Sequence, residues 1–275
     1  MATILVAANA HLDRVWRLAA PLRAGGRNAW TSVETRYGGG GFNTGSVLLA
    51  LGHAVRLATT LADDDAGRRH RDALAARGFA VDAVAMVPGA TQPLEILLDP
   101  SGERTILSPA EQRPGPAHLA LDGVDLAYVN LRRWPGDPAA LRRHAERIVA
   151  QLPLVADEPR PARVLIAARS DVGGDDDGIL ARARRAAGAS LEAVVVTAGA
   201  GAVTVLPAGI SPTLPVETLP HGTDTTGAGD VFAAGLLDGL AAGAAIGDTV
   251  ARAVAIAGRV LTDRGRYIDD RIALP

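Results

Sequence analysis

Short apolar runs alternate along the chain with segments in which apolar residues recur at helical spacing. Runs of strand length occupy residues 3–8, 55–60, 81–87, 126–130, 164–167 and 193–197. Segments with helical spacing occupy residues 44–51, 66–77, 139–151, 232–240 and 246–261. This alternation is typical of a mostly parallel sheet covered on both faces by helices. We therefore predict one α/β domain spanning residues 1–275, built as a three-layer α/β/α sandwich.

A hairpin interrupts this alternation. The strand-like runs 94–98 and 104–107 flank Asp99-Pro100-Ser101-Gly102, a turn sequence, with no helical segment beside them. Further strand-like pieces lie between Val15 and Val33. Together they predict a small β-sheet lid, formed by residues of about 12–36 and 91–108.

Composition narrows the function classes. The net charge of −2 suggests neither a nucleic-acid partner nor an anionic membrane surface. The N-terminal apolar run is too short to span a bilayer and has no basic flank, so we expect a cytoplasmic protein without a membrane anchor. Cysteine is absent, which excludes disulfides and thiolate chemistry. Lysine is absent too, which excludes a Walker-A loop, a protein-kinase site and Schiff-base chemistry.

The strongest local motif is Asp224-Thr225-Thr226-Gly227-Ala228-Gly229-Asp230, which runs directly into an apolar helical segment. Alternating glycines and a helix N-terminus offer backbone N–H groups to an anion, such as a phosphoryl group in transfer. Asp230 stands where it can accept a proton from an attacking hydroxyl. The alternative is an aspartate that only caps its helix.

The second motif is the glycine run 38–41 followed by Phe42 and Asn43, which opens another helical segment. Glycines let a substrate lie against bare backbone, and the Asn43 amide can donate to and accept from a polyol. A mobile loop capped by Asn43 is the alternative. A dinucleotide fingerprint is disfavoured, because Asn43 and Thr44 stand where its third glycine would fall.

The two motifs, in this order and at this separation, resemble those of the ribokinase/PfkB carbohydrate-kinase family. GGGGFNTGSVLLALG, with Asp63-Asp64 and Gly67 after it, is similar to the family's N-terminal signature. DTTGAGDVFAAGLL is similar to its C-terminal signature, the more specific of the two. Gly-Glu-Arg at 102–104 matches the lid hairpin, and residues 197–201 match a nucleotide loop. The resemblance covers nearly the whole chain.

The resemblance implies an ATP-dependent phosphotransferase that uses Mg²⁺ and moves the γ-phosphate to an alcohol. Asp230 would be the general base, and the N–H groups of Gly227, Ala228 and Gly229 would hold the transferring phosphoryl group. Asp224 matches a residue that ligates a monovalent cation, K⁺, in many members. Lid-mediated homodimers also occur in the family.

The same resemblance implies binding residues for both substrates. Asp13, placed at the end of the first strand, would bind sugar hydroxyls, with Gly39, Gly40 and Asn43 beside it. The nucleotide would contact three residues of the later loop, Thr197, Gly199 and Gly201.

Three departures from the family pattern bear on the substrate and the metal. Gly40 stands where ribokinases commonly carry lysine, which disfavours ribose. The family's Mg²⁺-ordering Asn-x-x-Glu reads Ala168 to Asp171 here, so Asp171 is the candidate replacement for the glutamate. Arg132 follows the strand 126–130 and could bind a carboxylate or phosphate, which predicts an anionic sugar. A surface-exposed Arg132–Arg133 pair is the alternative.

The sequence favours a sugar or sugar-phosphate kinase. The alternative within the same class is a nucleoside kinase, against which the aromatic content of 3% argues because a base needs stacking partners. A non-catalytic ligand-binding member of the same fold stays open because of the altered segment at 168–171.

Overall fold

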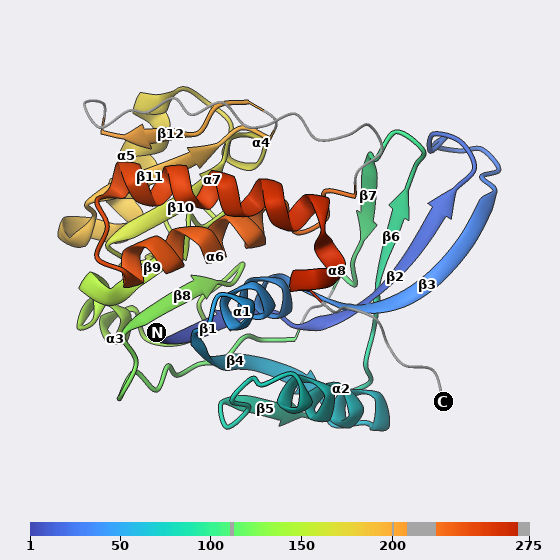
Figure 1. Cartoon of the computed structure of the whole chain (residues 1–275), viewed down its shortest axis with the longest axis horizontal. Coiled ribbons are helices and arrows are strands. Elements are labelled where there is room, and N and C mark those ends of the chain that lie inside the picture. The colour runs from blue at the N-terminus through green and yellow to red at the C-terminus, as the bar shows by residue number, and fades with distance from the viewer. Residues whose placement is uncertain (111–112, 200, 208–223, 269–275) are drawn as a thin grey trace.

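A large, mostly parallel sheet forms the centre of the computed structural model, which describes residues 1–110, 113–199, 201–207 and 224–268. The sheet has eight strands in the order β12-β11-β10-β9-β8-β1-β4-β5, and β12 alone among them runs antiparallel to its neighbour (Figure 1). The strands are β1 (Thr3–Ala8), β4 (Ala54–Ala62), β5 (Val84–Val87), β8 (Leu126–Asn130), β9 (Ile148–Gln151), β10 (Val164–Ala168), β11 (Ala193–Thr197) and β12 (Thr204–Leu206).

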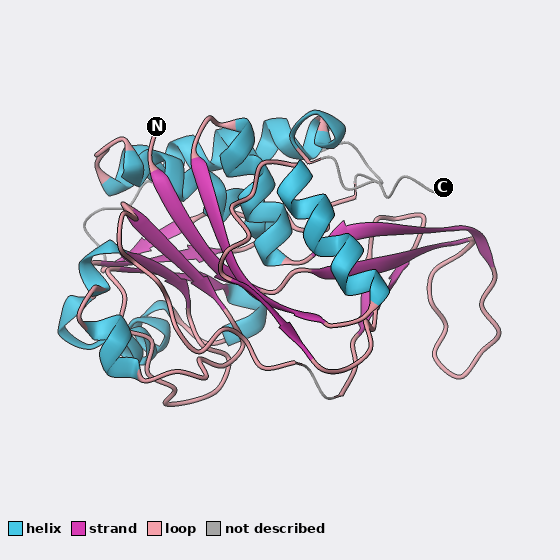
Figure 2. Ribbon diagram, turned by 90° about the horizontal axis from the view of Figure 1, so that it is seen from below, coloured by secondary structure: helices cyan, strands magenta, loops and turns pink. Residues whose placement is uncertain are grey.

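Helices cover both faces of this sheet (Figure 2). They are α1 (Gly40–Ala50), α2 (Asp65–Ala76), α3 (Pro138–Arg142), α4 (Arg169–Val172), α5 (Asp176–Ala187), α6 (Ala228–Ala241), α7 (Ile246–Thr262) and α8 (Arg264–Tyr267), with short 3₁₀ turns at Ala145–Arg147 and Gly188–Ser190. None of the helices in the described ranges is both long enough and apolar enough to cross a membrane.

Alternating side chains of the strands pack into two separate hydrophobic cores, one on each face of the sheet. In β1, Ile4 and Val6 join the core formed with α1, α2, α6 and α7, whereas Leu5 and Ala7 join the core formed with α3 and α5. Because successive residues of a strand point to opposite faces, a strand buried on both faces must be apolar at every position. The continuous apolar runs of the sequence therefore fix the predicted three-layer α/β/α sandwich, which the structure confirms.

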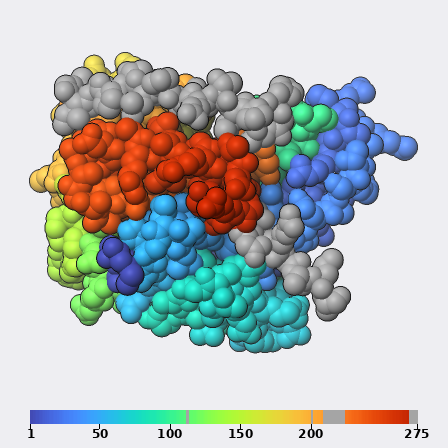
Figure 3. Space-filling view, in the orientation of Figure 1, coloured from blue at the N-terminus to red at the C-terminus, as the bar shows by residue number. Residues whose placement is uncertain are grey.

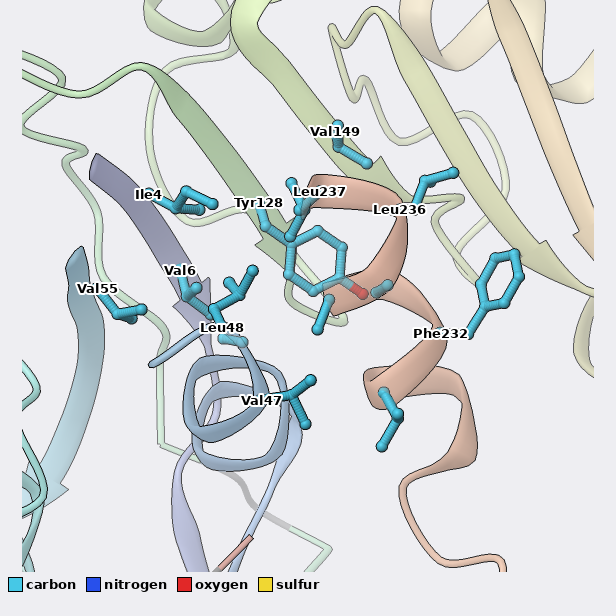
Figure 4. Close-up of a cluster of buried hydrophobic side chains, with 14 of the residues drawn as sticks. Ile4, Val6, Val47, Leu48, Val55, Tyr128, Val149, Phe232, Leu236 and Leu237 are labelled. Atoms are coloured by element: carbon cyan, nitrogen blue, oxygen red, sulfur yellow. The ribbon is translucent and has the colours of Figure 1, made fainter. Parts of the chain in front are cut away.

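The larger core holds α1 and α6 against the middle of the sheet. Tyr128, from β8, is fully buried there together with Leu48 of α1 and Leu236 and Leu237 of α6 (Figure 4). The Tyr128 hydroxyl accepts a hydrogen bond from Gln151 Nε2 at 2.7 Å, so its polar end is satisfied inside the core. This packing fixes the N-termini of α1 and α6, which carry the two glycine motifs.

A separate sheet of four strands stands at one end of the molecule (Figures 1 and 2). Its order is β3-β2-β6-β7, with β2 (His11–Leu18), β3 (Trp30–Gly38), β6 (Leu94–Leu98) and β7 (Arg104–Leu107). These strands fall in the segments from which the sequence predicted a lid, and the predicted hairpin is β6–β7. We refer to this sheet as the lid sheet. A homodimer through it stays a prediction.

The predicted helix over residues 139–151 is wrong. The helix α3 ends at Arg142, and Ile148–Gln151 forms β9, which pairs with both β8 and β10. Alanine, leucine and arginine favour a helix locally, but Ile148, Val149 and Ala150 are buried between two strands. Tertiary pairing therefore overrides local propensity. Among the other predicted elements, α1 begins at Gly40 instead of Thr44 and β5 begins at Val84 instead of Val81.

Candidate active site

The DTTGAGD motif forms a tight turn that leads into α6. Gly227 caps the helix with a φ of 81°, a left-handed conformation that glycine adopts without steric cost. The N–H of Ala228 donates to the Thr225 carbonyl at 3.0 Å, so it is already used within the turn. Among the described residues, the N–H groups of Gly227 and Gly229 have no hydrogen-bond partner. Of the three N–H groups expected to bind a phosphoryl group, these two are available.

Asp230 lies in the first turn of α6, and its carboxylate is held by two amide side chains. Asn43 Nδ2 donates to Oδ2 at 3.0 Å, and Asn130 Nδ2 lies 3.4 Å from Oδ1. The hydroxyl of Thr44 donates to the Asp230 backbone carbonyl at 3.1 Å. The N-cap of α6 is Gly227, so the alternative in which Asp230 serves only as a cap is not what the structure shows. Both partners of the carboxylate come from other elements, α1 and β8.

The environment of Asp230 favours a proton acceptor. Burial raises the pKa of its carboxyl above the ordinary value, whereas the hydrogen bond from Asn43 and the charges of His11 and Arg264 lower it. The negative charge of Asp13 adds to the upward shift in the pKa. A carboxylate whose pKa is raised by burial is a stronger base than an exposed aspartate.

Asp13 is buried beside this carboxylate. It is the third residue of β2, in the lid sheet, and not the end of the first strand as the sequence suggested. Its exposed fraction is 4%, and its Oδ1 lies 2.8 Å from His11 Nδ1, an ion-pair distance. The strand β2 therefore brings a carboxylate and an imidazole to the same side of the site as Asp230.

The predicted substrate contacts divide into two groups. Gly39 caps α1, and Gly40 faces the Asp230 carboxylate: a Cβ built on Gly40 would lie 3.0 Å from Asp230 Oδ1. Asn43, also expected to bind substrate, donates to the Asp230 carboxylate, and its contact with a substrate stays a prediction. Arg132 lies just beyond the end of β8 and is exposed, and within the described residues it makes no ion pair or side-chain hydrogen bond. The structure therefore does not bring Arg132 into contact with the other site residues.

The predicted nucleotide residues lie at the carboxyl edge of the large sheet. Thr197 ends β11, and its hydroxyl donates to the Ala167 carbonyl at 3.4 Å. Gly199 and Gly201 follow in the turn toward β12, where the Gly201 N–H donates to the Ala198 carbonyl at 2.8 Å. Asn130 ends β8 at the same edge, because β8 to β11 are parallel neighbours. Ligands of such sheets bind outside the carboxyl ends of the strands.

Asp224, the predicted cation ligand, is engaged by protein groups. Arg36 Nη2 donates to Oδ2 at 2.8 Å, and the Thr226 N–H donates to Oδ1 at 2.9 Å. Burial raises the pKa of Asp224, but the charge of Arg36 and these hydrogen bonds outweigh it and hold the pKa at about 2. The carboxylate is thus ionised and paired.

Four residues of the site were not singled out from the sequence, His11, Arg36, Asn130 and Arg264, and Arg104 was singled out only as part of the lid hairpin. Asn130 could have been predicted from the sequence, since a polar residue that ends a buried parallel strand lies at the edge of the sheet where ligands bind. The contacts of the three arginines could not, because their partner is the loop 224–226, between about 40 and 190 residues away along the chain.

Comparisons with known proteins bear on the C-terminal part of the chain and on the fold. Residues 166–271 match the model of the pfkB family of carbohydrate kinases. A comparison with curated proteins found no match.

Three solved structures illustrate the similarity of fold. A microbiome-derived acarbose kinase is 20% identical, with a TM-score of 0.76 over 95% of this chain and 92% of its own. The Burkholderia thailandensis nucleoside kinase, in complex with inosine, is 18% identical with a TM-score of 0.75 over 97% and 94%. Ribokinase from Cryptococcus neoformans var. grubii, in complex with ADP, is 19% identical with a TM-score of 0.70 over 95% and 94%.

The solved structures therefore show that this chain has a ribokinase-like fold, and the family model matches the part of the chain that contains the C-terminal motif. The resemblance of this chain to the ribokinase/PfkB family is confirmed, by the family model over residues 166–271 and by the fold over nearly all of the chain.

Proposed function

We propose that this protein transfers the γ-phosphate of ATP to a hydroxyl of a sugar or sugar derivative. The acceptor oxygen attacks the γ-phosphorus while Asp230 takes its proton. The bond between the γ-phosphorus and the bridging oxygen breaks, and ADP leaves with the electron pair. The acceptor lies beside Gly40, Asp13 and His11, and the nucleotide lies along the carboxyl edge of the sheet near Thr197.

The observation that carries this proposal is the position of Asp230. Its carboxylate has a raised pKa and is fixed by Asn43 and Asn130. It shares the first turn of α6 with the N–H groups of Gly227 and Gly229, which have no partner among the described residues. A proton acceptor and an anion-binding turn are thus built into the same end of α6. Phosphoryl transfer needs a proton acceptor next to an anion-binding turn. Its catalysis consists mainly of positioning the reactants and stabilising the charge on the phosphoryl group.

Mg²⁺ prefers carboxylate and phosphate oxygens, and a carboxylate is available at the carboxyl edge of the large sheet. Asp171, in α4 directly after β10, offers an exposed carboxylate that accepts a hydrogen bond from Ser170 Oγ at 3.1 Å. We assign Asp171 as the residue that helps to hold the metal. When bound with ATP, Mg²⁺ would neutralise phosphate charge.

The acceptor is proposed to be anionic, a sugar phosphate or a sugar acid. The support is that Arg132 follows Asn130 by two residues, is exposed, and has no ion-pair partner among the described residues. A guanidinium two residues beyond Asn130, which contacts Asp230, can bind a carboxylate or phosphate of a small substrate.

The test is formation of ADP from Mg·ATP across a panel of neutral sugars, sugar phosphates, sugar acids and nucleosides. We expect turnover that depends on one class of sugar-like acceptor, with the phosphorylated product detected by mass spectrometry. Turnover only with nucleosides would show that the acceptor is a nucleoside and not a sugar. No turnover with any acceptor, while ATP still binds, would contradict the proposed kinase activity.

The anionic assignment has its own matched pair of variants. Arg132→Ala should raise KM for the acceptor, whereas Arg133→Ala, the exposed neighbour, should leave it near the wild-type value. Loss of one charged hydrogen bond corresponds to a rise of about tenfold or more. An unchanged KM in Arg132→Ala for every accepted substrate contradicts the assignment.

A further inference from the structure

We propose that Arg36 and Arg264 take the place of a monovalent cation at the turn before α6, so that phosphoryl transfer by this protein does not require K⁺. The inference rests on the proposed kinase function. It departs from the expectation that Asp224 ligates K⁺, and it assigns two positioning residues.

Several oxygen atoms of the turn accept hydrogen bonds from protein donors, whereas the buried Thr226 hydroxyl has no partner among the described residues. The two carboxylate oxygens of Asp224 accept from Arg36 and from the Thr226 N–H, at 2.8 and 2.9 Å. The Thr226 carbonyl accepts from Arg264 Nη1 at 2.7 Å. The Thr225 hydroxyl accepts from Arg104 Nη1 at 3.2 Å. K⁺ binds by replacing its water shell with several such oxygens, and here four of them, the two of Asp224, the Thr226 carbonyl and the Thr225 hydroxyl, already accept from protein donors.

The charges lead to the same conclusion. Arg36 is buried, with an exposed fraction of 7%, and forms an ion pair with Asp224. The turn therefore already carries the fixed positive charge that would balance Asp224. A second cation at this position would meet two guanidinium groups at close range, where like charges disfavour each other strongly.

The two arginines reach the turn from separate elements. Arg36 belongs to β3 of the lid sheet, and Arg264 begins α8, which packs against α1 and lies at the surface beside it (Figure 3). The turn is thereby tied at once to the lid sheet and to the C-terminal helices. Since the turn presents the N–H groups of Gly227 and Gly229, these two ties hold the anion-binding geometry.

Arg264 also acts on the base through Asn43. Its Nη2 lies 3.4 Å from Asn43 Oδ1, while Asn43 Nδ2 donates to Asp230 at 3.0 Å. A guanidinium can only donate, so it fixes which end of the amide faces the carboxylate. Arg264 is therefore a positioning residue for both halves of the site.

The first test does not depend on turnover. The midpoint of thermal unfolding is measured in KCl, NaCl and tetramethylammonium chloride, each at about 0.1 M to keep screening equal. A ligand that binds the folded state raises the midpoint by mass action. We expect the three midpoints to agree within about 1 °C, and a K⁺-specific rise of several degrees overturns the proposal. This result stands even where no acceptor has been found.

The second test uses the acceptor that the panel identifies. Initial rates in K⁺ and in tetramethylammonium should agree within about twofold, and a stimulation by K⁺ of about tenfold or more overturns the proposal. The failure of the proposed kinase function would instead appear as no turnover in either salt.

The third test uses variants. Arg264→Gln should lower kcat by about tenfold or more with little change in KM for ATP, and Arg264→Lys should retain more of the rate because it keeps the charge. Arg36→Gln, which frees the Asp224 carboxylate, should acquire a K⁺-specific rise in the unfolding midpoint. Arg17→Gln, an exposed arginine of the lid sheet paired with Glu34, is the matched control without such a rise. A kcat in Arg264→Gln equal to that of the wild type contradicts the positioning role.

Discussion

Asp230 shows how one side chain gains its role from residues far away in the sequence. Its carboxylate touches Asn43 and Asn130, which lie 187 and 100 residues earlier in the chain. Two residues of the lid sheet shift the pKa of this carboxylate: Asp13 raises it and His11 lowers it. The sequence motif identified Asp230 but could not identify these partners, because no local pattern encodes contacts between α1, β2, β8 and α6.

The pH dependence of activity should follow the pKa of Asp230. The base must be ionised, so kcat/KM falls as the pH drops through a pKa that burial has raised. Because His11 lowers that pKa, His11→Gln should move the acid limb to higher pH. Asp13 raises it, so Asp13→Asn should move the limb to lower pH. Profiles of kcat/KM against pH check both directions, and identical acid limbs in all three proteins would contradict the assignment.

Gly40 is a position where any side chain intrudes on the base. A Cβ there would lie 2.6 Å from Asn130 Nδ2 and 3.0 Å from Asp230 Oδ1. Gly40→Ala should therefore displace the Asn130 amide and lower kcat/KM by about tenfold or more, while the midpoint of thermal unfolding changes little. Gly265→Ala, where a Cβ would meet nothing within 4 Å, is the control. Equal kcat/KM in Gly40→Ala and the wild type contradicts a substrate lying at this backbone.

At the scale of elements, the Asp63-Asp64…Gly67 part of the N-terminal signature has a structural role. Asp64 caps α2 by accepting from the Gly67 N–H at 2.7 Å, and it also accepts from the N–H and hydroxyl of Thr91 at 2.6 and 2.8 Å. Thr91 stands three residues before β6. The cap therefore joins a helix of the sandwich to the segment that enters the lid sheet.

Removal of this carboxylate should destabilise the protein. Asp64→Ala loses the helix cap, a cost of about 1 kcal/mol in the free energy of unfolding, together with both bonds to Thr91. Hydrogen bonds from Thr91 and Gly67 lower the pKa of Asp64 to about 2, from an ordinary value of 3.8. Its stabilisation is therefore complete above about pH 4 and is lost as the pH falls toward 2.

Denaturant unfolding of the wild type and Asp64→Asn at several pH values checks this. The difference in unfolding free energy should shrink between pH 4 and 2, as the wild-type carboxylate becomes protonated. Asp65→Asn, an exposed neighbour in the first turn of α2, serves as the control. A difference that stays constant over this range would contradict the role of the Asp64 charge.

The elements differ in how well the sequence predicts them. The strands of the central sheet are continuous apolar runs. Such a run is typical of a strand buried on both faces, so the sequence predicts these strands well. The segment 139–151 was predicted incorrectly, because Arg142 to Arg147 favour a helix while Ile148 to Gln151 gain more from pairing with β8 and β10. Local propensity cannot report a strand whose stability comes from its neighbours.

The whole molecule brings four separate parts of the chain to one end of α6. The lid sheet supplies His11, Asp13 and Arg36, α1 supplies Asn43, β8 supplies Asn130, and α8 supplies Arg264. The sequence could predict the place of Asp230 in its motif, the glycine turn and the separate small sheet, because each is a local pattern. The arginine contacts to residues 224–226 could not be predicted, because they exist only after the two sheets have been placed against each other.

The most direct measurement is the rate of ADP formation by the wild type and by Asp230→Asn, with the acceptor that supports turnover. Affinity for ATP and the midpoint of thermal unfolding are measured on the same samples. The substitution keeps the shape of the side chain and removes the proton acceptor. We predict a fall in kcat of about a hundredfold or more, with ATP affinity and folding preserved. A variant that turns over at the wild-type rate would contradict the assignment of Asp230 as the base.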